Sequence, residues 1–324
     1  MGDSTKTTIF ASRMSQPSFS IIIPHYHIPD LLMRCLDSIP VRDDIQVIVV
    51  DDCSPEVDTY LLKYPALSRP FLELYHTPIG GSAGRARNIG MDHARGKWLI
   101  FIDADDFFVK DIDAILEAAR DRTEDILFHN YTAVKNSDLT TPGVRNWYSK
   151  FFAEYAIDGK EDRFRYLFPS LVGKIFKREF VIEHQIRFDE TSHSNDVGFS
   201  FKCGAFAKTI GIVNRTFFVV TEREGSLAAY QFTGVKRSVQ EFIARFDVAL
   251  STQAFKDRQH IPIQFAPYKE NAFAFFKAYP RPFIRHYYRF VLPHYPQYAL
   301  PIFWAIITKG IRRILVNIYH RFKK

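Results

Sequence analysis

The sequence predicts an α/β protein with a mainly parallel sheet flanked by helices, followed by a C-terminal helical extension rich in basic and aromatic residues. Three observations predict this fold class. Short apolar runs recur along the first 102 residues, segments with helical periodicity separate them, and carboxylates follow two of the runs. Continuous apolar strands that alternate with helices are typical of a parallel sheet covered on both faces.

The first two apolar runs are FSIII (19–23) and IQVIVV (45–50). Between them, the segment IPDLLMRCLDSI is predicted to be a helix because apolar side chains recur at helical spacing, namely at Leu32, Cys35, Leu36 and Ile39. After the second run, Ser54 and Pro55 are suited to begin another helix, since serine is a good N-cap and proline fits the first helical position.

The third and fourth runs are FLELYH (71–76) and KWLIFI (97–102), which complete a β-α-β-α-β-α-β order. From 108 to 230 the pattern is mixed, with a helical segment DIDAILEAAR and a strand-like segment GIVNRTFFVVTE. Beyond residue 235, VQEFIARFDVAL is predicted to be helical, and after residue 270 the composition becomes aromatic and basic.

The formal charge of +7 is concentrated at the C-terminus, because residues 271–324 hold ten of the 43 Lys and Arg residues and none of the 36 Asp and Glu residues. The rest of the chain is slightly acidic and carries no recognition motif, so we do not expect nucleic acid as a partner. Three cysteines at unrelated spacings argue against a disulfide framework or a Cys-rich zinc site and favour a reducing compartment. Residues 1–17 are polar, which predicts a flexible tail, and no apolar run approaches the ~20 residues of a membrane span.

Carboxylates gather at the end of the fourth run, in the segment LIFIDADDF (99–107). In an extended segment Asp103 and Asp105 point the same way, and converging carboxylates repel each other unless a cation lies between them. Mg²⁺ and Mn²⁺ prefer oxygen ligands and commonly combine one or two carboxylates with substrate phosphates. The alternative is a solvated loop whose aspartates cap the next helix, and the segment alone does not decide between the two.

Two further segments fit a phosphate-containing ligand. Asp51 and Asp52 follow the second run, and in a parallel sheet ligands bind at such strand ends. The segment PIGGSAGRARNIG (78–90) combines glycines, which permit close backbone approach, with Arg85 and Arg87, which suit a phosphate or a carboxylate. Ordinary turn and cap roles are the alternatives for both segments, and neither GxGxxG nor GxxxxGK[ST] is present.

Taken in this order, the segments resemble those of the family 2 glycosyltransferases, which have the GT-A fold. The matching pieces are FSIIIPHY, DLLMRCLDSI, VIVVDDCS, GSAGRARNIGMDHARGKWLIFIDADDF, GKIFKREFVIEHQIRFDE, SNDVGFS and TEREGSLA, and they span residues 18–228. The resemblance implies a Rossmann-like GT-A domain whose nucleotide-sugar-binding half is 18–107 and whose acceptor-binding half is 108–230. Residues 231–324 would then form the helical extension.

The resemblance also implies a reaction and a donor site. Such enzymes move a sugar from a nucleotide diphosphate, here most simply a UDP-sugar, to an acceptor hydroxyl, usually with inversion. Asp52 would contact the nucleotide base, with Asp51 beside it. Asp105 would bind Mn²⁺ or Mg²⁺ directly, and Asp103 would lie near the ribose or a metal-bound water, so that the metal neutralises the departing diphosphate. The other donor-site residues that the motifs imply are Pro24, Tyr26, Gly84, Arg87, Ala104, Arg223 and Ser226.

Inversion in one step needs a base that deprotonates the acceptor hydroxyl. The family's Glu-Asp-like motif implies that Asp196 in SNDVGF has this role, although Asn195 stands where the first acidic residue is expected. Asp189 and Glu190 are neighbouring candidates. The acceptor implied by the resemblance is a surface polysaccharide or a lipid-linked glycan of bacterial type.

The last part of the chain, residues 301–324, has the pattern of an amphipathic helix. One arc holds Ile307, Ile311, Ile314, Leu315, Ile318 and Phe322, and the other holds Lys309, Arg312, Arg313, His320, Lys323 and Lys324. This pattern predicts that an otherwise cytoplasmic enzyme contacts the inner face of the cytoplasmic membrane peripherally. Packing against the catalytic domain and a homodimer contact are the alternatives.

Two other functions are open at this point. A haloacid-dehalogenase-type phosphatase also has a DxD after an apolar strand, but its motif needs Thr or Val where this chain has Phe107. A non-catalytic, glycosyltransferase-like membrane scaffold would bind a nucleotide without turnover. The complete DxD and Asp196 argue against that loss of catalysis.

Overall fold

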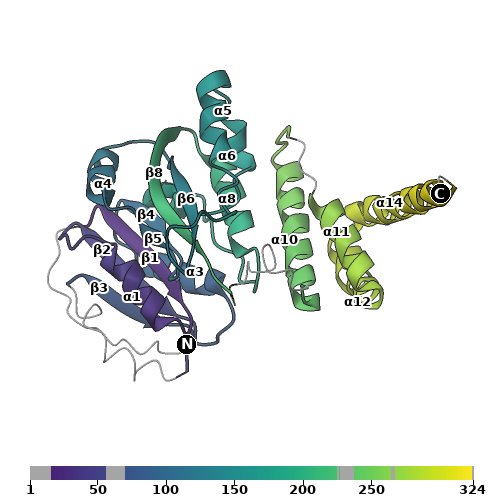
Figure 1. Ribbon diagram of the computed structural model, residues 1–324, viewed down its shortest axis with the longest axis horizontal. Helices are drawn as coiled ribbons and strands as arrows, with labels where there is room; N and C mark the ends of the chain where they lie inside the picture. The colour runs from purple at the N-terminus through teal and green to yellow at the C-terminus, as the bar shows by residue number, and fades with distance from the viewer. Residues whose placement is uncertain (1–15, 56–69, 225, 227–236, 264–266, 323–324) are drawn as a thin grey trace. The chain divides into compact units, whose positions relative to one another are not determined.

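The computed structural model of the chain describes residues 16–55, 70–224, 226, 237–263 and 267–322, with residues 310–322 described as backbone. The chain divides into two compact units, residues 1–235 and residues 236–324 (Figure 1). Each unit has a hydrophobic core of its own.

The first unit contains, within its described residues, an eight-stranded sheet in the order β3-β2-β1-β4-β7-β6-β8-β5. Its strands are β1 (Phe19–His25), β2 (Ile45–Asp51), β3 (Leu72–His76), β4 (Trp98–Phe101), β5 (Phe107–Phe108), β6 (Ile126–Lys135), β7 (Lys174–Lys177) and β8 (Ile210–Glu222).

Strands β1 to β4 form the parallel half of this sheet. Helix α1 (Pro29–Asp37) connects β1 to β2, and α3 (Ala83–His93) lies between β3 and β4. The connection through α1 leads from β1 to β2, on one side of β1 in the sheet, whereas the connection through α3 leads from β3 back past β1 to β4, on its other side. Because both crossovers between parallel strands are right-handed, α1 and α3 lie on opposite faces of the sheet. With both faces covered, every residue of β1 and β2 is buried, which is why these strands are continuous apolar runs.

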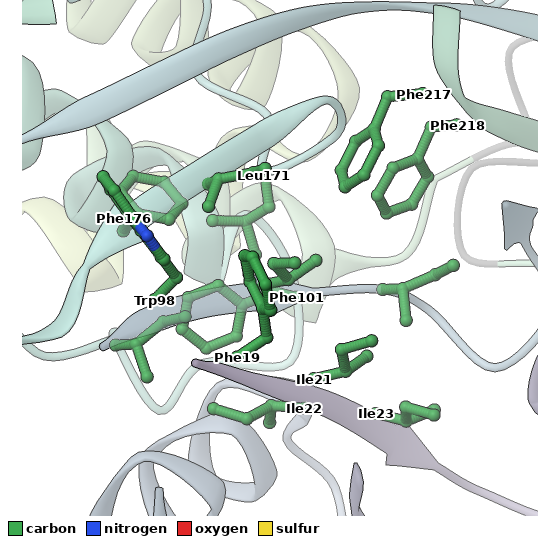
Figure 2. Packing of buried hydrophobic residues seen from close by; sticks show 14 of the residues in the cluster. Phe19, Ile21, Ile22, Ile23, Trp98, Phe101, Leu171, Phe176, Phe217 and Phe218 are labelled. Carbon is green, nitrogen blue, oxygen red and sulfur yellow. The ribbon is translucent and has the colours of Figure 1, made fainter. Parts of the chain in front are cut away.

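The other half of the sheet is mixed. β7 pairs antiparallel with β4 and β6, β8 pairs parallel with β6, and the short β5 pairs antiparallel with β8. The accompanying helices are α4 (Ile112–Arg120), α5 (Lys150–Asp158), α6 (Asp162–Tyr166), α7 (Arg178–Glu183) and α8 (Asn195–Phe206). Figure 2 shows how aromatic and aliphatic side chains of several strands pack together, among them Phe19, Trp98, Phe101 and Phe176.

The second unit is helical. Its elements are α10 (Val239–Arg258), α11 (Pro267–Ala278), α12 (Pro280–His286), the π-helical turn η2 (Tyr287–Val291), α13 (Leu292–His294) and α14 (Pro296–Phe322). Phe246, Leu250, Phe275, Phe283 and Ile302 are among its buried core residues. Of the helices that the structure describes, none has both the length and the apolar character needed to cross a membrane.

The structure confirms the predicted α/β class with a mainly parallel sheet and a C-terminal helical region. The four predicted strands appear as β1 to β4, and the predicted helical face of Leu32, Cys35 and Leu36 is buried in α1. The helix expected after Pro55 lies outside the described residues. So do most of the predicted tail (1–17) and the predicted boundary at 230, while the boundary proposed between 107 and 108 falls inside β5.

Candidate functional site

The first part of the site is the carboxyl end of β2, where Asp51 is fully buried opposite His25 of β1. The His25 Nδ1 atom lies 2.8 Å from one Asp51 oxygen, and Ser54 donates its backbone N–H and its hydroxyl to Asp51 at 2.8 and 2.6 Å. Burial by itself would raise the pKa of Asp51, but the hydrogen bonds from His25, His76 and Ser54 outweigh it and hold the pKa well below its usual range. These hydrogen bonds connect the ends of β1 and β2 through the Asp51 carboxylate.

The neighbouring Asp52 holds the glycine-rich turn. One of its oxygens accepts from the Thr77 hydroxyl at 2.8 Å, and the other accepts the backbone N–H groups of Gly81 and Ser82, both at 2.8 Å. Ser82 then caps α3, because its hydroxyl accepts the N–H of Arg85. Both oxygens of Asp52 thus bind the turn that leads into α3.

The predicted residues at the end of β1 differ in exposure. Pro24 is buried within the strand, whereas the side chain of Tyr26 is 58% exposed beyond it. Tyr26 consequently presents an aromatic surface at the strand end, where the resemblance expects a nucleotide.

The acidic cluster follows β4. Among the described residues, carboxylate oxygens of Asp103, Asp105 and Asp106 lie within 4.8 Å of one another. Asp103 is exposed, Asp105 is partly buried, and Asp106 is buried together with Ala104. Burial and the neighbouring Asp103 raise the pKa of Asp105, and burial together with Asp105 and Asp103 raises the pKa of Asp106. The three carboxylates therefore repel one another at the end of β4.

The backbone of this cluster is held by α1 and β8. Thr221 donates its hydroxyl to the Asp105 carbonyl oxygen at 2.6 Å and its N–H to the Asp106 carboxylate at 2.8 Å. Arg34 of α1 donates to the same Asp105 carbonyl and, at 2.7 Å, to the side chain of Asn136. Two elements far apart in the sequence therefore fix the direction in which the carboxylates point.

Two arginines each bind one carboxylate of the cluster. Arg223 donates from Nε to Asp105 at 2.9 Å, and Arg87 donates from Nη2 to Asp103 at 2.5 Å. Among the described residues, no hydrogen bond reaches the second oxygen of either carboxylate. Ser226, also expected at the donor site, has a buried hydroxyl that forms no hydrogen bond with the described part of the chain.

Arg87 also connects the cluster to α8. Its Nη1 donates to the Asn195 side-chain oxygen at 2.7 Å, and its guanidinium carbon lies 5.5 Å from the centre of the Phe188 ring. Gly84 permits this approach of α3, because a Cβ atom at that position would lie 2.1 Å from the carbonyl oxygen of Asp189. Asn195 is the residue that replaces the expected acid, and here its neutral amide accepts from Arg87.

Asp196 lies in the first turn of α8, next to Asn195, and is largely buried without being closed off from solvent. Burial raises the pKa of its carboxyl group, Asp103 adds to this effect, and the positive charges of Arg87 and Lys174 oppose it. The side chain of Asp196 accepts no hydrogen bond from other described residues. By contrast, the neighbouring candidate Glu190 is bound by Arg85 at 2.9 Å and by Asn88 at 3.2 Å.

A loop after β6 borders the cluster. Glu222 at the end of β8 is fully buried and accepts the N–H groups of Val144 and Arg145 at 2.5 and 2.8 Å, as well as the Lys135 ammonium. The Arg145 guanidinium is close enough to lower the pKa values of Asp105 and Asp106. Glu222 therefore anchors a loop that brings a third arginine toward the carboxylates.

Comparison with known proteins shows the family of this chain. The sequence model described as Glycosyl transferase family 2 matches residues 20–183, which is half of the chain. The chain belongs to glycosyl transferase family 2. This membership confirms the resemblance drawn from the ordered motifs.

Two curated relatives illustrate the extent of the similarity. The Bacillus subtilis protein EpsH is 27% identical over 217 residues, covering 63% of this chain and 61% of EpsH. The Staphylococcus aureus poly(ribitol-phosphate) beta-N-acetylglucosaminyltransferase TarS is 25% identical over 218 residues, covering 64% of this chain and 36% of TarS. The chain thus aligns with less than two thirds of the length of either relative.

Solved structures share the fold. A crystal structure of S. aureus TarS 1–349 in complex with UDP-GlcNAc has a TM-score of 0.56 at 19% identity and covers 89% of this chain and 81% of that chain. A mannosyltransferase from Pyrobaculum calidifontis, in complex with GDP-Man and Mn²⁺, has a TM-score of 0.51 at 19% identity and covers 95% of this chain and 83% of that one. The GT-A architecture expected for the family is therefore the architecture observed.

Arg34, Thr221 and Glu222 position the acidic cluster and its neighbouring loop, and their role is not predictable from the sequence. Arg34 is one cation on the polar face of an amphipathic helix, and its partner Asp105 lies 71 residues away in the sequence. Thr221 and Glu222 belong to β8, whose sequence pattern indicates which residues are buried but not which side chains they contact. A local motif contains no signal for such contacts.

Proposed function

We propose that the chain is an inverting, metal-dependent glycosyltransferase that moves a hexosyl or N-acetylhexosaminyl group from a nucleotide diphosphate donor to an acceptor hydroxyl. The observation that carries the proposal is the connection between Asp103 and the start of α8, made by Arg87 and Asn195. This connection holds a carboxylate cluster suited to a metal diphosphate at a fixed position relative to Asp196, the candidate base. A fixed relation between leaving group and base is what a one-step displacement requires.

The donor would bind along the strand ends. Asp52 positions the turn before α3, and the exposed ring of Tyr26 offers a surface for the base. Arg223 has Nη donors beyond the Nε that holds Asp105, so it is suited to contact the diphosphate, as the resemblance implies for Arg223 and Ser226. Charge developing on the leaving group would then meet preorganised donors.

The carboxylates fit Mn²⁺ or Mg²⁺. Asp103 and Asp105 are each bound through one oxygen, which leaves the second oxygen of each for a cation, and burial beside Asp103 raises the pKa of Asp105. When bound, such an ion neutralises the charge of the departing nucleotide diphosphate.

Asp196 is the proposed base. Its raised pKa favours accepting a proton from the acceptor hydroxyl, since a base with a very low pKa would have little affinity for it. The positive charges of Arg87 and Lys174 oppose the rise of this pKa.

A UDP-sugar is the proposed donor, supported by the UDP-GlcNAc complex of TarS, and a surface polysaccharide or lipid-linked glycan is the proposed acceptor. We also propose a cytoplasmic location with peripheral membrane contact. The part of the predicted amphipathic surface beyond residue 309 lies outside the described side chains, and a homodimer contact there is the competing proposal.

Thermal unfolding of the full chain tests the donor site. UDP, GDP, TDP and CMP would each be added with and without Mn²⁺, to the wild type and to Asp105→Asn. A ligand at 100 times its dissociation constant stabilises by about 2.7 kcal/mol, which raises the melting temperature by several degrees. We expect one nucleotide, most simply UDP, to do this only with Mn²⁺ and only in the wild type. Asp113→Asn, on an exposed carboxylate, serves as the control, and no shift with any nucleotide would contradict the proposal.

Release of UDP from UDP-sugars in the presence of glycan acceptors tests the base. Asp196→Asn should retain the Mn²⁺-dependent nucleotide shift and lose about 10²- to 10⁴-fold in turnover, because only proton transfer is removed. Glu179→Gln, which removes an exposed carboxylate of α7, should leave turnover unchanged. Full activity of Asp196→Asn would assign the base elsewhere.

A further inference from the structure

The second unit has an exposed helical surface that combines arginines with apolar side chains. Residues 280–294 form one continuous helix through α12, η2 and α13. On it, five exposed residues recur every three or four positions, and we call them the arginine face: Arg281, Ile284, Arg285, Tyr288 and Arg289. The opposite side carries Phe283 and Val291 into the core of the unit, so the helix cannot rotate to hide its exposed face.

The charges of the arginine face are not neutralised within the described residues. Some other cationic and imidazole groups of this unit are paired with carboxylates, among them Lys309 with Glu270 at 3.0 Å and His286 with Asp247 at 2.7 Å. No such pair is present in the described structure for Arg281, Arg285 or Arg289. Because residues 271–324 include no Asp or Glu, the chain offers these arginines no nearby carboxylate in sequence either.

Two apolar side chains lie among the arginines. Ile284 is 46% exposed and Tyr288 is 65% exposed. A soluble polyanion would satisfy the three guanidiniums and would leave Ile284 and Tyr288 in water. The headgroup region of a bilayer accommodates both kinds of side chain, because arginine reaches lipid phosphates while its stem, and an amphipathic ring such as tyrosine, lie at the boundary with the acyl chains.

We propose that the arginine face binds the surface of a membrane that contains anionic lipids. Binding would be peripheral and reversible, because two apolar side chains bury far less apolar surface in a bilayer than a membrane-spanning helix does. The proposal depends on the helix of the second unit and not on the glycosyltransferase function, so either can fail without the other. It also differs from the contact predicted for residues 301–324, because it uses other residues.

Vesicle co-sedimentation of the full chain tests the charges. Vesicles of phosphatidylcholine alone would be compared with vesicles of phosphatidylcholine mixed with phosphatidylglycerol, at low and at high salt. We expect binding to the anionic vesicles, weakened by salt. The triple variant Arg281→Gln, Arg285→Gln, Arg289→Gln should reduce the partition coefficient on the order of 100-fold, since each cation near an anionic surface contributes about a factor of five.

A matched control distinguishes an effect of the arginine face from an effect of the net charge of the protein. Lys110→Gln, Lys160→Gln and Lys208→Gln together remove the same charge from exposed positions of the first unit. This control should bind anionic vesicles within about twofold of the wild type, because its cations lie outside the arginine face. Equal binding by the two triple variants, or no binding of the wild type to anionic vesicles, would overturn the proposal.

The apolar side chains distinguish a membrane from a soluble polyanion. Ile284→Ser with Tyr288→Ser should reduce partitioning about fivefold, because these side chains would no longer leave water on binding. If this variant binds vesicles as tightly as the wild type, the face is a polyanion site and the membrane proposal is wrong. Thermal unfolding of every variant verifies that the exposed substitutions leave the helices folded.

Discussion

Arg87 is the residue through which the structure connects the acidic cluster to α8, and Arg87→Lys tests that connection. Lysine keeps the positive charge but has a single ammonium group, so it cannot donate to Asn195 and Asp103 in the two directions that the guanidinium spans. It also loses the planar contact with the ring of Phe188. The substitution therefore removes the paired hydrogen bonds of Arg87 to Asn195 and Asp103 and keeps the positive charge.

The expected loss of stability follows from the groups that Arg87→Lys leaves without a partner. Leaving the buried Asn195 oxygen without a donor costs about 1–3 kcal/mol, and losing the contact with Phe188 costs about 1 kcal/mol more. The ion pair to Asp103 adds little, because the Asp103 side chain is 49% exposed and lysine can still reach it. A total of about 3 kcal/mol corresponds to a fall in melting temperature of roughly 6–12 °C for a unit of this size.

Arg85→Lys is the matched control, since Arg85 lies on the same helix and its partner Glu190 is 45% exposed. An exposed pair contributes at most about 1 kcal/mol, so the control should shift the melting temperature by less than about 4 °C. Differential scanning calorimetry of both variants, with and without Mn²⁺ and UDP, measures the difference. Equal shifts for the two variants would refute the idea that Arg87 connects the cluster to α8.

Three further outcomes are expected. Glu222→Gln should lower the free energy of unfolding by about 1–3 kcal/mol in urea titrations, because the amide oxygen can still accept from Val144 and Arg145 but the amide NH₂ group would then face the Lys135 ammonium; an unchanged midpoint would show that the loop is held otherwise. Gly84→Ala should destabilise by at least about 1–3 kcal/mol, since its Cβ would lie 2.1 Å from the Asp189 carbonyl, whereas Gly81→Ala meets no neighbour within 4 Å and suffers only from its positive φ. Burial lowers the pKa of Lys174 to about 7, so the unfolded chain binds the extra proton between pH 7 and about 10 and the wild type gains stability as pH rises through this range. Lys174→Met should lose that gain, which amounts to at most about 1.4 kcal/mol per pH unit, and identical slopes for both proteins would contradict the low pKa.

The sequence predicted the parallel half of the sheet well and the mixed half poorly, for a physical reason. β1 and β2 are buried on both faces, so their apolar runs are long and unambiguous. β5 has two residues, which is too short for a period to appear, and β7 has lysines at both ends of two apolar residues, so it forms no apolar run like that of β4. The pairing of β7 between β4 and β6 depends on contacts across the whole unit, and no local pattern encodes them.

The candidate site shows the same division. The convergence of the Asp103 and Asp105 carboxylates after β4 was predictable because both residues belong to one short segment, whereas their proposed role as metal ligands stays a prediction. The residues that orient them were not, because Arg34 and Thr221 act on the Asp105 carbonyl through contacts of 71 and 116 residues in sequence separation. The sequence showed that Asn195 stands where the family motif has an acidic residue. Only the structure shows that its amide oxygen accepts a hydrogen bond from Arg87.

The arginines around the cluster indicate how binding of a cation and of a diphosphate would be coupled. Arg223 pairs with Asp105, and Arg87 pairs with Asp103, so the two carboxylates proposed as metal ligands are also the partners of two guanidiniums. A cation bound to the Asp105 carboxylate would weaken the ion pair between Asp105 and Arg223. The Arg223 guanidinium would then be more available to bind a phosphate. Any ligand that makes a second ligand bind more tightly is itself bound more tightly in return. Because Asp105 is the partner of Arg223 and a proposed metal ligand, the two proposed bindings would be coupled through this carboxylate.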